Sequence, residues 1–230
     1  MMMLRLAPAA LLAAALVLAG CARGPEKPSA QLEVAQAVGQ YVLRRRNPPP
    51  PPAQLTRALL DQETQPYLEA TIENRDAKAY LIRSFSRSDD HPGRIEVWRT
   101  QDNVSLALRQ GMVTATRGLG GGLLSASVPA AAGQAGPVRG GARTYVLRDK
   151  GNGQTRLTLA CSLHDLGPEP VKIVELTHPT RRLQERCEGA GGVVVNDYWI
   201  DSRPGHSQVW QSRQWAGPEV GYIRIRQLWR

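Results

Sequence analysis

Apolar and polar residues alternate along much of this chain with a period of two, which is typical of strands that bury one face. Between Val104 and Arg109, for example, apolar side chains at even positions alternate with Ser, Ala and Arg at odd positions. Similar segments, rich in β-branched and aromatic residues and bounded by turn residues, predict further strands. They cover residues 67–73, 79–86, 94–100, 112–116, 143–148, 155–163, 171–176, 183–187, 193–201, 208–215 and 222–229.

Helical spacing replaces this alternation only near the N-terminus. Between residues 30 and 46, Val34, Val38 and Tyr41 fall on one face of a predicted helix. Five consecutive prolines at 48–52 end it, because such a run adopts extended polyproline structure. A second short helix is predicted at 54–62.

The order of these elements predicts a mainly β fold. Many short strands at regular spacing indicate a large antiparallel sheet, curved or forming an open barrel, with one or two N-terminal helices. Two stretches of small residues, 120–122 and 130–141, are predicted as loops. The strands and both helices are assigned to a single domain over 30–230.

The first twenty residues have the features of a secretory signal peptide. Arg5 precedes an apolar stretch that is shorter than the roughly 20 residues of a membrane-spanning helix. The stretch ends in Leu-Ala-Gly-Cys, with the cysteine at position 21, and this resembles the lipobox of bacterial lipoproteins. The resemblance implies cleavage before Cys21, a lipid on its sulfur and acyl chains such as palmitate. The alternative is an ordinary signal peptide followed by a chance cysteine.

The lipobox resemblance also bears on the location of the protein. Residues 21–29 then form an acylated tether, polar and containing two prolines. Ala22, rather than Asp, follows the cysteine. This favours the outer membrane, with the protein facing the periplasm or the cell surface.

The excess of basic over acidic residues indicates which kind of molecule the protein binds. The chain has 29 basic and 20 acidic residues, and only Arg5 lies in the signal segment, so 28 against 20 remain, a balance of +8. Such an excess favours anionic partners, which outside the cytoplasm are phospholipid, lipopolysaccharide and acidic polysaccharide. No basic run alternates with aromatic residues, so nucleic acid is not predicted as a partner. The alternative is a basic surface that only keeps the protein soluble.

Two cysteines remain once Cys21 is acylated. Cys161 and Cys187 lie in what is predicted to be an oxidising compartment, where two thiols usually pair. The alternative is two separately buried free thiols. Their spacing fits neither a zinc site nor a redox motif.

No pattern of residues predicts a catalytic site, a metal site or a cofactor. The four histidines share no metal-ligand spacing, and His91, His178 and His206 stand beside Pro or Gly, as exposed turn residues do. Two acid pairs could support glycoside hydrolysis, which needs one protonated and one ionised carboxyl group. They are the turn pair Asp89 and Asp90, and the pair Asp197 and Asp201, whose even spacing on one strand aims both to one face.

Two stretches of the chain are similar to a known family. The first runs from Val104 to Leu124 and contains Thr116, Gly118 and Leu119 after a strand and a glycine turn. The second contains Asn196, Tyr198, Trp199 and Asp201, followed by Gly205, Ser212, Gln214 and Pro218. Together they resemble the YjbF/GfcB-type lipoproteins, which are associated with group 4 capsule and exopolysaccharide production.

The resemblance implies a non-enzymatic accessory lipoprotein in polysaccharide secretion, acting beside outer-membrane export proteins. Two other functions stay open: a lipid or lipoprotein carrier with an apolar cavity, and a hydrolase that uses Asp197 and Asp201. The aromatic residues Tyr198, Trp199, Trp210 and Trp215 are predicted to fill the core, with carbohydrate stacking as the alternative.

Overall fold

A computed structural model of the chain describes residues 55–149 and 153–228. The lipobox with Cys21, the tether, the predicted helix at 30–46 and the proline run lie outside the described residues. The second predicted helix is present as α3 (Arg57–Gln62). The Thr56 side chain caps it by accepting a hydrogen bond from the Leu59 backbone at 3.3 Å, and Leu60 is buried. Among the described residues, no helix has the length and apolar character needed to cross a membrane.

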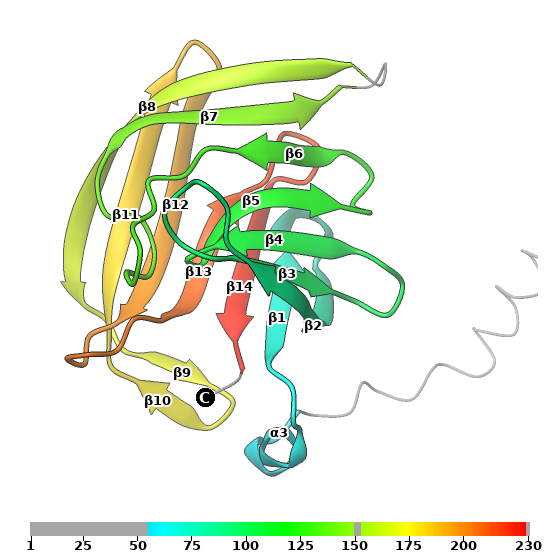
Figure 1. Cartoon of the computed structure of the whole chain (residues 1–230), viewed down its shortest axis with the longest axis vertical. Helices are drawn as coiled ribbons and strands as arrows, with labels where there is room; N and C mark the ends of the chain where they lie inside the picture. The colour runs from blue at the N-terminus through cyan, green and yellow to red at the C-terminus, as the bar shows by residue number, and fades with distance from the viewer. Residues whose placement is uncertain (1–54, 150–152, 229–230) are drawn as a thin grey trace, which may run out of the picture. The chain divides into compact units, whose positions relative to one another are not determined.

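Twelve antiparallel strands form one strongly curved sheet (Figure 1). In sheet order they are β5 (Met112–Arg117), β4 (Ser105–Arg109), β3 (Ile95–Arg99), β2 (Ala77–Arg87), β1 (Tyr67–Ile72), β14 (Tyr222–Gln227), β13 (Val209–Trp215), β12 (Gly192–Asp201), β11 (Thr180–Gly189), β8 (Gln154–Pro168), β7 (Gly141–Arg148) and β6 (Gly122–Ala126). A short 3-10 helix, η2 (Glu73–Arg75), joins β1 to β2. The mainly β fold and the large antiparallel curved sheet are confirmed.

The two edge strands of the sheet, β5 and β6, lie side by side and nearly close it into a barrel. A side chain joins them, because the Leu123 backbone N–H donates to Thr116 Oγ1 at 3.1 Å. Gly122 permits this approach: a Cβ at that position would stand 2.5 Å from the same Thr116 oxygen. Strand β6 is a departure from prediction, since Gly122 was assigned to a loop and no strand was expected after it.

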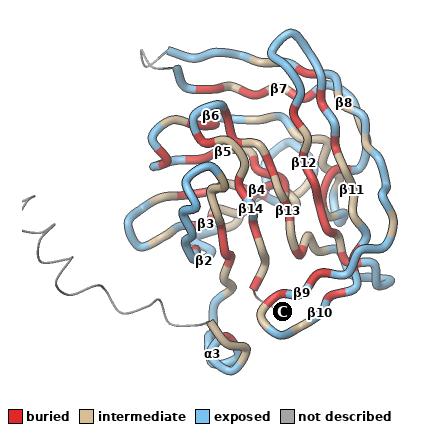
Figure 2. Tube along the Cα trace, turned by 180° about the vertical axis from the view of Figure 1, so that it is seen from behind, coloured by how far each residue is buried: buried red, intermediate tan, exposed pale blue. Residues whose placement is uncertain are grey.

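Buried residues recur along most of the strands (Figure 2). The main core contains Leu68, Leu81, Trp98, Leu106, Leu123, Tyr145, Leu159 and Ile223, each at most 2 % exposed. These large side chains fill the space that the curved sheet encloses.

One predicted strand is in fact a hairpin. Residues 171–176 divide into β9 (Val171–Ile173) and β10 (Leu176–His178), which pair with each other. Val174 and Glu175 form the turn with φ of 41° and 72°, a left-handed conformation that the apolar pattern does not indicate. The hairpin belongs to a second core cluster of Leu60, Val171, Ile173, Trp199, Trp210 and Leu228.

Candidate functional site

The two stretches that resemble the family meet inside the sheet. Gln214 on β13 donates to the Gly111 carbonyl at 2.8 Å and accepts from the Val113 backbone N–H at 2.8 Å. Strands β13 and β5 are not neighbours in the sheet, so this side chain ties one edge of the sheet to the opposite wall. Leu119 is buried, and its carbonyl accepts from Arg75 at 2.9 Å. At Gly118, a Cβ would approach Val104 Cα to 3.1 Å.

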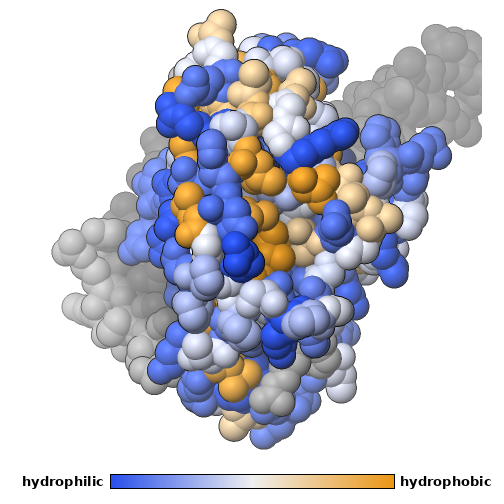
Figure 3. Space-filling model, turned by 90° about the vertical axis from the view of Figure 1, so that its left-hand side faces the viewer, coloured by the Kyte–Doolittle hydropathy of each residue, from blue (hydrophilic) through white to orange (hydrophobic). Residues whose placement is uncertain are grey.

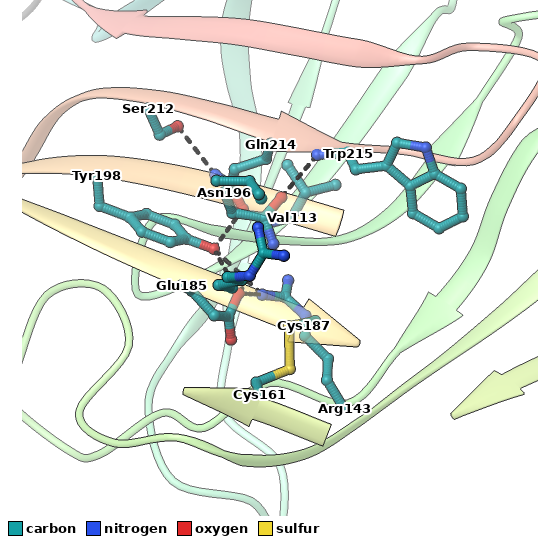
Figure 4. Close-up of polar contacts among 12 residues, drawn as sticks. Val113, Arg143, Cys161, Glu185, Cys187, Asn196, Tyr198, Ser212, Gln214 and Trp215 are labelled. Atoms are coloured by element: carbon teal, nitrogen blue, oxygen red, sulfur yellow. Dashed lines mark hydrogen bonds and ion pairs between the residues drawn. A yellow bond between two sulfur atoms is a disulfide. The ribbon is translucent and has the colours of Figure 1, made fainter. Parts of the chain in front are cut away.

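A buried polar network surrounds this connection (Figure 4). Arg143 on β7 forms an ion pair with Glu185 on β11, and both side chains are at most 2 % exposed. Asn196 donates to Glu185 Oε2 at 2.8 Å and accepts from the Trp215 backbone N–H at 2.8 Å. Burial raises the pKa of Tyr198 well above its usual value of 10.0, so its hydroxyl stays protonated and donates to Gln214 Oε1 at 3.3 Å. These side-chain contacts connect four strands in the interior, β7, β11, β12 and β13.

A disulfide lies against the same network. Cys161 on β8 and Cys187 on β11 face each other across the strand pair and are bonded. Their sulfurs lie within 4.8 Å of a Glu185 carboxylate oxygen. Because both sulfurs are in the disulfide, they are not available as thiolate ligands for a metal.

The remaining family-pattern residues stabilise the end of the sheet near the β9–β10 hairpin. The Trp199 indole donates to Glu169 at 2.9 Å, and the Trp210 indole donates to Asp201 at 2.9 Å. His178 is buried and stacks on Trp210 with 3.6 Å between ring centroids, which corrects its assignment as an exposed turn residue. Tyr198, Trp199 and Trp210 are all buried in the core, as predicted, and Trp215 is half-buried.

Arginine side chains bind acids of both candidate pairs. Asp197 accepts from Arg182 at 3.0 Å and from Gln184 at 3.1 Å. Hydrogen bonds from Arg203 lower the pKa of Asp201, which opposes the raised pKa of a general acid. In the turn pair, hydrogen bonds from Arg109 likewise lower the pKa of Asp89. All three carboxylates therefore bind arginine side chains.

An apolar cleft that could take a lipid is small. A cleft lined by apolar residues of β1, β2, β4 and β14, among them Ile72, Leu81 and Leu106, has a volume of about 190 Å³. Pockets that bury a drug-sized ligand have roughly 300–1,000 Å³. On the face formed by β8 and β11, hydrophobic residues occur in small groups between hydrophilic ones (Figure 3).

A hollow of about 690 Å³ lies on the outward side of strands β2 to β6. Trp98, Leu106 and Leu108 on β3 and β4 point into the core, so the alternating residues of these strands point to the other side. Two rows of that outer face contain the arginines. Strand pairing aligns Arg99, Ser105 and Arg117 in one row, and Arg87, Ile95 and Arg109 in the other. Between them lies a row of Phe85, Val97, Ala107 and Ala115. We call this hollow the arginine groove.

Three cations of the groove are not neutralised. Arg87, Arg99 and Arg117 are exposed and have no ion-pair partner among the residues that the structure describes. Arg109 differs, because it is 7 % exposed and its guanidinium binds the Asp89 carboxylate at 2.6 Å and the Gly93 carbonyl at 2.8 Å. Arg109 thereby fixes the turn after β2 at the rim of the groove. The Asp89 carboxylate in that turn is already paired with Arg109.

The sequence analysis did not single out these arginines. A signal was present, since Arg109 occupies a polar position of the alternating β4 pattern and Arg99 and Arg117 end the strands on either side. Which arginines share a face depends on strand register, and that is a property of the folded sheet.

The fold is shared with a solved structure, and the sequence matches a family of lipoproteins. The hypothetical lipoprotein YmcC from Escherichia coli (K12) has a similar fold, with a TM-score of 0.60 and 20 % sequence identity over 77 % of this chain and 90 % of that chain. The family described as "Group 4 capsule polysaccharide lipoprotein gfcB, YjbF" matches residues 31–228. This chain belongs to that family, and the resemblance seen in its two motifs is confirmed. No curated protein matches the chain.

Proposed function

We propose that this protein is a lipid-anchored, non-enzymatic accessory of capsule or exopolysaccharide secretion, and that it binds an acidic polysaccharide in the arginine groove. The family description supports a role in capsule or exopolysaccharide secretion, since it refers to a capsule polysaccharide lipoprotein. The predicted anchor at Cys21 would hold it on the outer membrane, facing the periplasm, beside the export proteins.

One observation carries the proposal: three guanidinium groups without an ion-pair partner among the described residues line a hollow of about 690 Å³. Guanidinium binds carboxylate through paired hydrogen bonds, which gives both strength and orientation. The floor between the arginine rows consists of Val97, Ala107 and Ala115, with Phe85 at 47 % exposure beside it. Such a surface suits the apolar face of a sugar ring while the arginines bind its acidic groups.

The proposal is tested by titrating the full-length protein, purified in detergent, with polygalacturonate as the acidic probe and dextran as the neutral one. The triple variant Arg87→Ala, Arg99→Ala, Arg117→Ala should bind polygalacturonate at least tenfold more weakly, since a hydrogen bond to a charged group contributes about 1.5–3 kcal/mol. Added salt should weaken binding by the unchanged protein.

The matched control is Arg139→Ala, Arg156→Ala, Lys172→Ala. It removes the same charge from three exposed residues outside the groove. Equal losses in both triple variants would show that net charge alone attracts the polymer and would overturn the groove as the site. Equal binding of dextran and polygalacturonate would overturn the acidic ligand.

A further inference from the structure

We infer that the arginine groove is the central part of a longer track, which binds a linear acidic chain over several sugar residues rather than one acidic headgroup. This rests on the proposed function and adds the form of the ligand. The evidence is that hollows adjoin the groove at both ends and share its lining residues.

Beyond β5, the groove continues into a hollow of about 500 Å³ that shares Thr116, Arg117 and Leu124 with it. Four of its eight lining residues are glycines, Gly118 and Gly120 to Gly122. Because glycine has no side chain, they leave the floor of the hollow uncovered, and a Cβ at Gly120 would meet no atom within 4 Å. This end is open, and Arg117 is its exposed cation.

At the other end, the groove meets a hollow of about 390 Å³ through their shared residue His91. That hollow in turn shares Arg94, Gln110 and Ser207 with a pocket of about 180 Å³, which also contains Ser212. Amide, hydroxyl and guanidinium groups therefore continue past the arginine rows, up to a pocket that the Glu96 carboxylate and Leu108 also line on the inner side of the sheet. These groups can hydrogen-bond the hydroxyl groups of a sugar.

The dimensions of the sheet make the track long. Neighbouring strands lie about 4.8 Å apart, so the three steps from β2 to β5 make the groove about 14 Å wide across the strands. Along the strands, the two arginine rows are four residues apart, which corresponds to about 13 Å. Cations distributed over such a distance match acidic groups that repeat along a chain.

The test measures the affinity of the full-length protein for oligogalacturonates of increasing length, expressed per sugar residue, with glycerol phosphate as a headgroup probe. Affinity should rise at least tenfold from the disaccharide to a chain that fills the track, and then level off. Glycerol phosphate should not displace the long chain at concentrations that displace the disaccharide.

Two isosteric pairs of variants test the ends. Gly120→Asp and Ser207→Asp place a negative charge at opposite ends, whereas Gly120→Asn and Ser207→Asn add nearly the same shape without charge. Asp and Asn both tolerate the positive φ of +71° at Gly120. The Asp variants should bind long chains at least threefold more weakly than their Asn counterparts and bind the disaccharide equally well.

The outcomes separate the two proposals. A disaccharide that binds as tightly as the long chain, or Asp variants that equal their Asn counterparts, would overturn the track and leave the groove as a compact site. Loss of discrimination between acidic and neutral polymers would overturn the proposed function itself, and the track with it.

Discussion

Gln214 and Val113 are 101 residues apart in the sequence, yet the Gln214 side chain accepts a hydrogen bond from the Val113 backbone at 2.8 Å across the interior of the sheet. The same amide donates to the Gly111 carbonyl, so one side chain bonds two backbone groups at the start of β5. Gln214 belongs to one family motif and Gly111 to the other. The motifs are therefore joined by a contact that holds the nearly closed sheet together.

Gln214→Leu should destabilise the protein by about 2–4 kcal/mol, because it leaves a buried backbone donor and acceptor without partners. Urea unfolding followed by tryptophan fluorescence measures the change. Gln211→Ala on the same strand is the control, since this half-buried glutamine lies outside the network and should change stability by less than about 0.5 kcal/mol. Equal effects of the two variants would contradict the bracing role of Gln214.

Glu185→Gln should cost about 3–5 kcal/mol, because it leaves the buried Arg143 guanidinium without its counter-charge. The double variant Arg143→Met, Glu185→Leu should be less destabilised than the single one, since no unpaired charge remains buried. Calorimetry or urea unfolding of the single and double variants measures their coupling. Strictly additive losses would show that the pair does not act as a unit.

The stability of the folded sheet should fall at acid pH through Asp89 and Asp201. Bonds from arginine lower the pKa of both carboxyl groups in the folded protein, so the unfolded chain binds more protons below about pH 4. Their contribution is present above that pH and is lost as the pH falls further. Asp201→Asn should lower stability at pH 7 and flatten its decline between about pH 4 and 2, as thermal melts at each pH would reveal. A decline as steep as that of the unchanged protein would rule Asp201 out as a cause.

Replacing Cys161 and Cys187 together with Ala should lower stability by about 3 kcal/mol, given a sequence separation of 26 residues. Reducing the unchanged protein with dithiothreitol should give a similar loss, whereas the double variant should not respond to the reductant. A response of that variant would mean that the reductant acts elsewhere. Neither change should release the protein from the membrane.

Cys21→Ser should abolish acylation, because a hydroxyl is far less nucleophilic than a thiol. The precursor should stay uncut, or a clipped form should be found free in the periplasm. Labelling with a radioactive fatty acid, followed by membrane fractionation, measures both effects, with Cys161→Ala as the labelled control. Persisting label on Cys21→Ser would refute the lipid anchor.

The sequence by itself determined which residues form most strands and which class the fold belongs to. Alternation of apolar and polar residues is a local property, because the buried face of a strand can be identified from the residues of that strand. The segment from Val104 to Arg109 has this pattern whatever strands it pairs with. The two family motifs could also be recognised in the sequence, because a motif is defined by the types and order of its residues. Trp199 and Trp210 were assigned to the core on their apolar character, and they are buried there.

Tertiary structure decided what these residues do together. Strand β6 begins at Gly122, which local propensity assigns to a loop. The strand can approach Thr116 because a glycine at this position has no Cβ to collide with the Thr116 hydroxyl oxygen. The turn at Val174 and Glu175 is left-handed without a glycine, so only packing of the hairpin on the second core cluster explains it. Arg87, Arg99 and Arg117 come from three strands, and their common face follows from pairing register. Register depends on how distant strands bury their apolar faces against one another, and no single segment of the sequence contains that information.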